Sequence, residues 1–281
     1  MPAFSLARFS LLSLCAIAGL VGEETAARGE TWDYAPTAKA AAATFTGQAG
    51  KVVPMGDSIT YANPSSRWAR MGTGRTPEED AVCAWMRAGK NDASNGWWLA
   101  ANDQPSNRSW TAASGVTSKG YIQGGKGGLP ALADLLQQHK PQIALVLLGT
   151  NDVLRNVPAK DYLASMEEIY TACLASGALP VVTTIPPTSK AKAADVQAYN
   201  DGLHALAARL KLPFLDLHGE FMRFGPDGSW QKNLLSTDGI HLSAEAAAGP
   251  ATEENLKKSG ALLKCVSQTR KVLEIKTRMT W

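Results

Sequence analysis

The sequence predicts an α/β fold in which a parallel sheet carries helices on both faces. Short apolar runs alternate along the chain with stretches of helical periodicity, and the links between them are short. The clearest strand is residues 143–148, a continuous apolar run of the kind that parallel sheets bury on both sides. With 281 residues, 45% hydrophobic and 19% charged, the chain has the size and composition of one sizeable soluble α/β domain.

Strands are expected where apolar runs stop at turn-forming residues, and helices where apolar side chains recur with helical spacing. Pro77 followed by three carboxylates is typical of a helix start. From residue 260 onwards a helix is favoured over a strand, because the following residues lack Gly and Pro and include many Lys and Arg. The expected strands cover residues 51–55, 96–100, 143–148, 179–185 and 213–217. The other expected helices cover residues 77–89, 129–139, 162–176 and 193–210.

The first residues have the pattern of an export signal. Arg8 precedes the mostly apolar run of residues 9–21, and small residues follow, with candidate cleavage positions after Ala18, Gly22 and Ala27. The run is too short for a stable membrane span. The sequence therefore predicts a signal peptide over residues 1–27 and a secreted or periplasmic protein; the alternative is an apolar first helix packed on the domain.

After the predicted signal peptide, the sequence is expected to form a short lead-in segment and one domain. Residues 28–47 carry few large apolar side chains and are expected to form a lead-in segment, and residues 48–281 form one domain without an internal linker. Cys15 raises the alternative of a lipoprotein, but Leu14 before it is too large for the usual lipid-attachment motif.

Charge and cysteine usage exclude several classes. The net charge is +3 without a long run of one sign, which gives no indication of a nucleic-acid partner. Cys83, Cys173 and Cys265 are far apart and odd in number, so they cannot complete a disulfide framework and are expected to be small buried hydrophobes. No Cys-x-x-Cys or His-x-x-x-His pair supports a metal site, and no cofactor is predicted.

The stretch Gly56-Asp57-Ser58-Ile59-Thr60 follows the first predicted strand. A serine there lies at the carboxyl edge of the sheet, where open α/β sheets carry their sites. Serine is a weak nucleophile on its own, so the chain must also supply a base, an acid that orients the base, and donors for an oxyanion.

The four histidines are the candidates for the base: His139, His204, His218 and His241. Only His241 follows an aspartate by three residues with a glycine between them, in Asp238-Gly-Ile-His241. That carboxylate can accept from imidazole Nδ1 and leave Nε2 free to take the serine proton. A lone Asp-x-x-His can also arise at any helix start, and His218, with Asp216 as its partner, remains an alternative base.

Asn151 and Gly115 are the candidate oxyanion donors. Asn151 follows a glycine at the end of the clearest strand, where its amide could stabilise an oxyanion by roughly 3 kcal/mol. The alternative is that Asn151 caps the next helix, a task that Asp152 could also perform. Gly115 is preferred to the other candidate glycines because residues 113–118 come soon after the second predicted strand; the others are Gly120, Gly124 and Gly125.

Residues 120–126 also have the glycine and lysine spacing of a phosphate-binding P-loop. Gly127 stands where Ser or Thr would bind magnesium, and no buried strand precedes the segment. A nucleotide site is therefore not predicted.

Taken in order, these blocks resemble the SGNH (GDSL-like) hydrolase family over residues 51–243. The resemblance implies a flavodoxin-like three-layer sandwich with about five parallel strands. It implies that Ser58 is the nucleophile, His241 the base and Asp238 its orienting acid. It also implies an oxyanion hole made by the Ser58 and Gly115 amides and the Asn151 side chain.

Two departures from the family pattern bear on the details. The second block is reduced to a glycine, and the link between residues 60 and 115 is longer than in minimal members. These departures affect the assignment of Gly115 and the substrate, and they leave the reaction class as it stands.

The expected function is a serine esterase that cleaves short acyl esters, such as acetyl groups, through an acyl-enzyme. Indole rings stack well on sugars, so the cluster of tryptophans between the first two blocks indicates a carbohydrate ester; the alternative is that some of them fill the core. A lysophospholipid or other lipid ester is a second candidate, and a non-catalytic carbohydrate-binding relative is a third. The tryptophans are Trp85, Trp97, Trp98 and Trp110.

Overall fold

The computed structural model describes residues 29–61, 63–86, 111–225 and 227–279. Four parallel strands form one sheet in the order β1-β2-β3-β4, and every strand residue is buried. Val52 pairs with Ile143, which in turn pairs with Leu179, so the carboxyl ends of three strands reach one edge together. The strands are β1 (Val52–Gly56), β2 (Ile143–Leu147), β3 (Leu179–Thr183) and β4 (Phe214–Leu215).

Residues 111–113 lie beside β1 on the side away from β2. Ala112 forms an isolated parallel bridge with Gly56, and the Thr111 hydroxyl donates to the Pro54 carbonyl at 2.6 Å. The sheet of about five strands expected from the sequence therefore has four strands and this bridge in the described residues. The predicted strand at residues 96–100 lies outside them.

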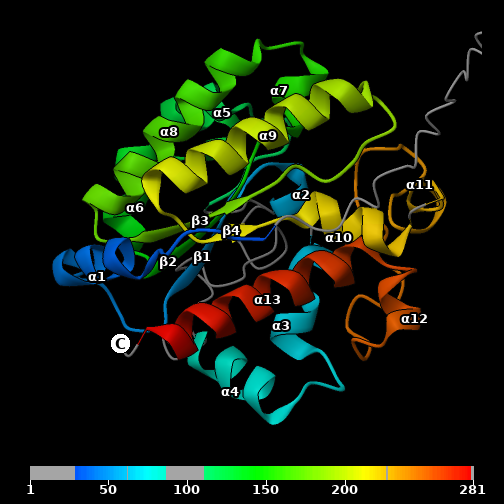
Figure 1. Cartoon of the computed structure of the whole chain (residues 1–281), viewed down its shortest axis with the longest axis horizontal. Helices are drawn as coiled ribbons and strands as arrows, with labels where there is room; N and C mark the ends of the chain where they lie inside the picture. Colours follow the sequence, from blue (N-terminus) through cyan, green and yellow to red (C-terminus); the bar gives the residue numbers. More distant parts are fainter. Residues whose placement is uncertain (1–28, 62, 87–110, 226, 280–281) are drawn as a thin grey trace, which may run out of the picture.

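Helices lie on both sides of the sheet (Figure 1). The prediction of a helix-covered parallel sheet is confirmed, and the favoured final helix is present as α13. One side carries α5 (Ser118–Gln123), α6 (Leu132–His139), α8 (Ala159–Ala175) and α9 (Ala193–Leu210). The other carries α3 (Arg67–Met71), α4 (Pro77–Met86), α10 (Leu217–Phe224) and α13 (Gly260–Arg278). Shorter elements are α2 (Ser58–Tyr61), η1 (Asn63–Ser66), η4 (Lys126–Gly128), α7 (Thr150–Leu154), α11 (Trp230–Asn233) and α12 (Glu253–Leu256).

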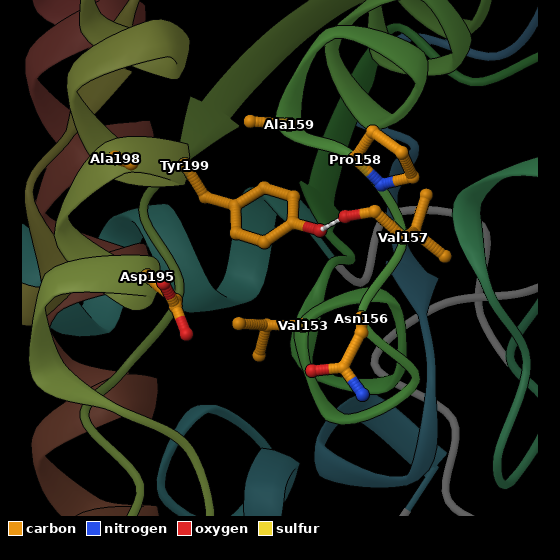
Figure 2. Close-up of a pocket in the computed structure, with 8 residues that line it drawn as sticks. All are labelled: Val153, Asn156, Val157, Pro158, Ala159, Asp195, Ala198 and Tyr199. Carbon is orange, nitrogen blue, oxygen red and sulfur yellow. Dashed lines mark hydrogen bonds between the residues drawn. The ribbon is translucent and has the colours of Figure 1, made fainter.

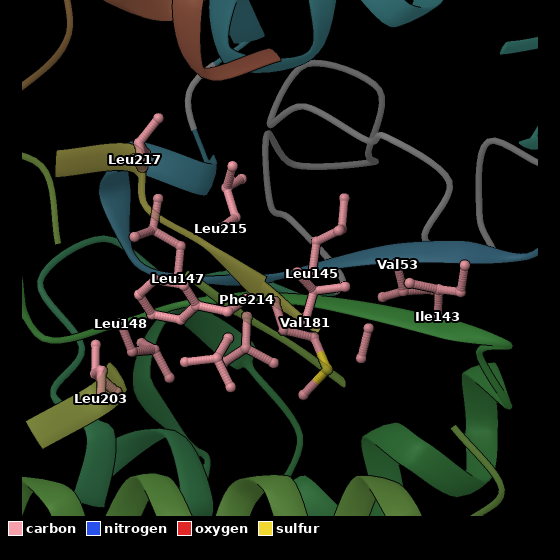
Figure 3. Close-up of a cluster of buried hydrophobic side chains, with 14 of the residues drawn as sticks. Val53, Ile143, Leu145, Leu147, Leu148, Val181, Leu203, Phe214, Leu215 and Leu217 are labelled. Carbon is pink, nitrogen blue, oxygen red and sulfur yellow. The ribbon is translucent and has the colours of Figure 1, made fainter. Parts of the chain in front are cut away.

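Apolar side chains of the strands and of the covering helices form a continuous core (Figure 3). Leu145 and Val181 come from the middle of the sheet, and Leu203 reaches the core from α9. Each such side chain contributes about 1.5–3 kcal/mol when it is removed from water. The rigidity of this core fixes the positions of the loops at the carboxyl edge.

The expected strand at residues 213–217 is shorter than predicted. β4 ends at Leu215 because Asp216 caps α10, accepting from the Gly219 amide at 3.0 Å. His218 consequently lies in the first turn of α10, and its backbone amide donates to the Thr184 hydroxyl.

The lead-in segment contributes to the packed structure. Helix α1 (Ala35–Thr44) contacts β3 and α8, and the two large aromatic residues before it, Trp32 and Tyr34, are buried. Trp32 Nε1 donates to the Leu212 carbonyl at 2.8 Å. A segment with few large apolar residues can thus still be anchored by two of them. The predicted signal peptide lies outside the described residues.

The three cysteines of the described residues, Cys83, Cys173 and Cys265, are buried free thiols in α4, α8 and α13, as expected for small apolar residues. Burial raises the pKa of Cys173 to about 12, which makes that thiol unreactive. Among the described helices, none combines the length and the apolar character that a membrane span requires.

Candidate active site

The turn after β1 presents Ser58 at the start of a short helix. Asp57 caps α2: its carboxylate accepts from the Ile59 amide at 2.9 Å, and its carbonyl accepts from the Thr60 and Tyr61 amides. Gly56 makes this turn possible, because a Cβ there would lie 2.5 Å from the Leu147 carbonyl oxygen. Ser58 is half-buried and is the first residue of the helix, where a backbone amide has no partner within the helix.

Asp57 also connects the serine turn to Asn151. The Asn151 amide donates to the second Asp57 oxygen at 3.1 Å, across 94 positions of sequence. Asp57 is 1% exposed, and this burial raises its pKa to about 6, against the lowering effect of the Ile59 amide, His241 and Asn151. Asn151 therefore lies beside the residue that positions Ser58, as an oxyanion donor requires.

Asn151 reaches this position through the backbone at Gly149, which begins α7 with φ +123°. A Cβ at Gly149 would lie 2.6 Å from Ile185 Cδ1 and 2.7 Å from the Tyr162 hydroxyl, so only glycine fits. Asp152, the residue after Asn151, does not cap α7 with its side chain. Its buried carboxylate accepts instead from the Ser118 hydroxyl at 2.7 Å and from the Ser118 amide, which ties α7 to α5.

Gly115 follows the segment that runs beside β1. The Ala113 amide donates to the Gly56 carbonyl at 3.2 Å, so the chain passes the carboxyl edge next to the serine turn. Gly115 has φ +71°, a conformation that favours glycine. Its carbonyl accepts at 2.9 Å from both Lys126 and Arg155.

Asp238 and His241 form the predicted pair on a surface loop. Their Oδ2 and Nδ1 atoms are 2.5 Å apart, and both side chains are nearly half exposed. The other Asp238 oxygen accepts from the Ser236 hydroxyl and from the Ile240 and His241 amides. Partial burial would raise the pKa of Asp238, but these hydrogen bonds outweigh it and hold the pKa well below its usual range.

The histidine loop is anchored to the same edge of the sheet. The Gly239 carbonyl accepts from the Thr188 hydroxyl at 2.8 Å and from the Ser189 amide at 3.0 Å, both on the loop after β3. A positive charge on His241 lowers the pKa of buried Asp57, against the larger effect of burial. With Nδ1 engaged by Asp238, the imidazole Nε2 is the nitrogen left for proton transfer.

The alternative base lies in a different setting. One Asp216 oxygen accepts from the Thr184 hydroxyl at 3.0 Å and from the Gly219 amide, so this carboxylate serves as the cap of α10.

Trp85 contacts the core and lies under Lys276, with the ammonium 5.6 Å from the ring centroid; this favours the core-filling alternative for that residue. The other three tryptophans of the cluster lie outside the described residues.

Sequence reasoning missed the roles of Asp57, Asp152 and Arg155. The position of Asp57 directly before a serine and a short helix was the available signal for a cap. The contacts of Asp152 and Arg155 join segments 34 and 40 positions apart, and no local pattern marks them.

A cavity of about 250 Å³ lies between the segment that joins α7 to α8 and the first turns of α9 (Figure 2). None of the predicted site residues lines it, and the Tyr199 hydroxyl closes one wall by donating to the Val157 carbonyl. The lining residues are Val153, Asn156, Val157, Pro158, Ala159, Asp195, Ala198 and Tyr199. In the described part of the chain, His, Cys, Asp and Glu side chains do not gather in groups of three or more that could hold a metal ion.

Comparison with known proteins places this arrangement in a family. An arylesterase of Vibrio mimicus is 30% identical over 121 residues, which are 42% of this chain and only 56% of that protein. The structure of a carbohydrate esterase family 3 protein from Talaromyces cellulolyticus has a TM-score of 0.54 at 19% identity, covering 82% of this chain and 99% of that one.

Esterase EstA from Pseudoalteromonas sp. has a TM-score of 0.52 at 16% identity, covering 81% of this chain and 99% of that one. At these identities the two structures establish a shared fold. The GDSL-like Lipase/Acylhydrolase family matches residues 55–248, a span that contains the serine turn, α7 and the histidine loop. The chain therefore belongs to the GDSL-like lipase/acylhydrolase family, the SGNH hydrolases.

Proposed function

We propose that this protein is a serine esterase in which Ser58, His241 and Asp238 hydrolyse short acyl esters through an acyl-enzyme. The observation that carries the proposal is the convergence on Asp57, the cap of the serine turn. Asn151 donates to this carboxylate, and the charge of His241 lowers its pKa. These two observations support a site at one edge of the sheet that contains the Ser58 hydroxyl, the Asn151 amide and the His241 imidazole.

The proposed reaction has two halves. Ser58 Oγ attacks the acyl carbonyl while His241 Nε2 takes its proton, and Asp238 stabilises the resulting imidazolium. The oxyanion accepts from the Ser58 and Gly115 amides and from the Asn151 side chain. His241 then protonates the leaving alcohol, activates a water molecule for attack on the acyl-serine, and returns its proton to Ser58 Oγ.

The proposed substrate is an acetylated carbohydrate, and the proposed location is outside the cytoplasm. The substrate proposal rests on the tryptophan-rich sequence between the first two blocks and on the fold shared with a carbohydrate esterase. The location rests on the signal-like pattern of residues 1–27. We also propose that the complete sheet is flavodoxin-like with about five strands, the bridge at Ala112 marking the fifth position.

Labelling with a fluorophosphonate probe tests the reaction class. We expect the probe to modify Ser58, and Ser58→Ala to lose labelling and ester hydrolysis together. The control is Ser176→Ala, because Ser176 ends α8 just before β3 and so lies at the opposite edge of the sheet. A protein that is not labelled and cleaves no ester would instead favour the non-catalytic carbohydrate binder.

An activity panel tests the substrate. Acetylated xylan oligosaccharides and acyl esters of increasing chain length are compared by kcat/KM. We expect acetyl groups on sugars to be removed fastest. Faster cleavage of long acyl chains or of lysophospholipids would replace the carbohydrate proposal with the lipid alternative and leave the serine mechanism unchanged.

A further inference from the structure

Two exposed cations converge on one backbone oxygen at the candidate oxyanion hole. Lys126 Nζ and Arg155 Nη2 each donate to the Gly115 carbonyl at 2.9 Å, from positions 11 and 40 residues away. Within the described residues neither side chain is within ion-pair distance of a carboxylate. Surface lysines and arginines usually remain hydrated or pair with acids, because ordering such a long side chain costs conformational entropy.

Both hydrogen bonds are accepted by a glycine, the residue type with the widest range of backbone conformations. Glycine has no Cβ, so its flanking peptides can rotate through conformations closed to other residues. At Gly115 the two cations hold the carbonyl, while a hydrogen bond from Val116 to the Ala113 carbonyl closes the turn around it. The φ of +71° is the reason for glycine at this position, since the nearest atom to a Cβ there would be Lys126 Nζ at 3.0 Å, the end of a flexible side chain that can move aside.

Arg155 also joins the two candidate oxyanion donors. Its backbone amide donates to the Asn151 carbonyl at 3.2 Å, so its side chain projects from the helical turn that carries Asn151. A second link runs in parallel, from Asp152 on the same helix to Ser118, three residues after Gly115. Helix α7 therefore holds the Gly115 segment at two points.

We infer that Arg155 and Lys126 are positioning residues that fix Gly115 so that its amide is aimed at the oxyanion before substrate binds. The inference rests on the proposed function, since it concerns the oxyanion hole of that site. Preorganised donors stabilise a transition state because they need no rearrangement during the reaction. The carbonyl and the amide of Gly115 belong to adjacent peptide units that meet at its Cα, so holding the carbonyl restricts rotation at that residue. Without the two cations this rotation is less restricted, and the donor is correctly placed for only part of the time.

The test uses Arg155→Ala, Lys126→Ala and the double variant on a neutral short acyl ester. We expect each single variant to lower kcat roughly tenfold, less than the ~10²–10³ that loss of a whole oxyanion donor costs. KM should stay within about twofold, because the ground-state carbonyl depends little on the hole. Arg155→Lys, which keeps a charged donor, should restore most of the loss, and fluorophosphonate labelling should slow in parallel with kcat.

Arg209→Ala and Lys119→Ala are the matched controls, since both side chains are exposed and lie on helices α9 and α5. Circular dichroism and thermal unfolding verify that each variant folds. Unchanged kcat in the double variant would overturn the inference. So would a rise in KM confined to acidic esters, which would make the two cations a binding site for a substrate anion. If Ser58→Ala retained full activity, the proposed function itself would fail, whatever the two cations do.

Discussion

The two halves of the candidate site are built in opposite ways. On the serine side, the carboxylates of Asp57 and Asp152 are buried and join segments that are distant in sequence. On the histidine side, Asp238 and His241 are nearly half exposed and bonded mainly within their own loop. The pKa values of the two aspartates differ for this reason. Burial raises the pKa of Asp57, whereas Asp238 is less buried and its hydrogen bonds lower its pKa.

This difference shows which part of the structure positions the side chains on the serine side and on the histidine side. The proposed nucleophile and oxyanion donors take their positions from the packed sheet, so substitutions there are expected to disturb folding as well as catalysis. The proposed base takes its position from one short loop, which is held at Gly239 by the loop after β3. We therefore expect substitutions in the histidine loop to separate activity from stability, and substitutions on the serine side to affect both.

The largest expected effect comes from His241→Ala. Loss of the general base should lower kcat by about 10⁴-fold or more on a short acyl ester. The melting temperature should change little, because the side chain is 43% exposed and belongs to no core cluster. His218→Ala is the comparison variant and should keep most of its activity. If His218→Ala were inactive and His241→Ala active, the base assignment would be reversed.

The contrast between Asp57 and Asp238 predicts opposite pH dependences of stability. Asp57 has a pKa of about 6 when folded and about 4 when unfolded, so its contribution is fully present below pH 4 and is lost as the pH rises through 6. At about 1.4 kcal/mol per unit, the loss is about 3 kcal/mol. For Asp238 the pKa is lowered, so its contribution is present above about pH 4 and is lost as the pH falls.

Urea unfolding of the wild type, Asp57→Asn and Asp238→Asn between pH 3 and 8 measures both effects. The stability of the wild type relative to Asp57→Asn should fall with increasing pH, and relative to Asp238→Asn it should rise. Parallel slopes for the two variants would show that the two carboxylates do not differ in the way described.

A smaller effect is expected at Lys264, a fully buried lysine of α13 whose Nζ donates to Gln268 at 3.1 Å. Burial lowers its pKa to about 8, although negative charge on Cys265 and Asp57 acts to raise it. At pH 7 the ammonium is therefore held in the interior at a cost in free energy. Lys264→Met should raise the free energy of unfolding by about 1–2 kcal/mol, since the lost hydrogen bond offsets part of the gain.

Thermal unfolding at pH 7 and pH 9.5 checks this prediction. Because a lowered lysine pKa makes the folded state of the wild type more stable as the pH rises through 8, the advantage of Lys264→Met should shrink at pH 9.5. Lys160→Met, at an exposed position of α8, should show neither change. A destabilised Lys264→Met would mean that the buried ammonium strengthens the fold.

Much of the fold could be predicted because its signals are local. The apolar run of β2 and the helical spacing of α9 are properties of neighbouring residues, and α9 begins and ends where the sequence indicates. The contribution of residues before β1 could not be predicted, because Trp32 and Tyr34 are buried only by partners about 180 and 240 positions away.

The candidate site divides in the same way. The Asp238–His241 contact follows from a spacing of three residues, so the sequence was sufficient to predict it. The link from Asn151 to Asp57 and the cations around Gly115 depend on how the sheet aligns distant segments. Chemistry encoded within one turn can be predicted from the sequence, whereas chemistry assembled across the sheet requires the structure.

Helix α13 sets an order of events during synthesis of this protein. It contacts α3, α4 and η1, the elements that follow the serine turn, yet it comes after all of them along the chain. The ribosome therefore makes Ser58 some two hundred residues before the helix that packs on that side of the molecule. Until then the elements that follow the serine turn lack the helix that packs on them, so this side of the fold can be completed only late in translation.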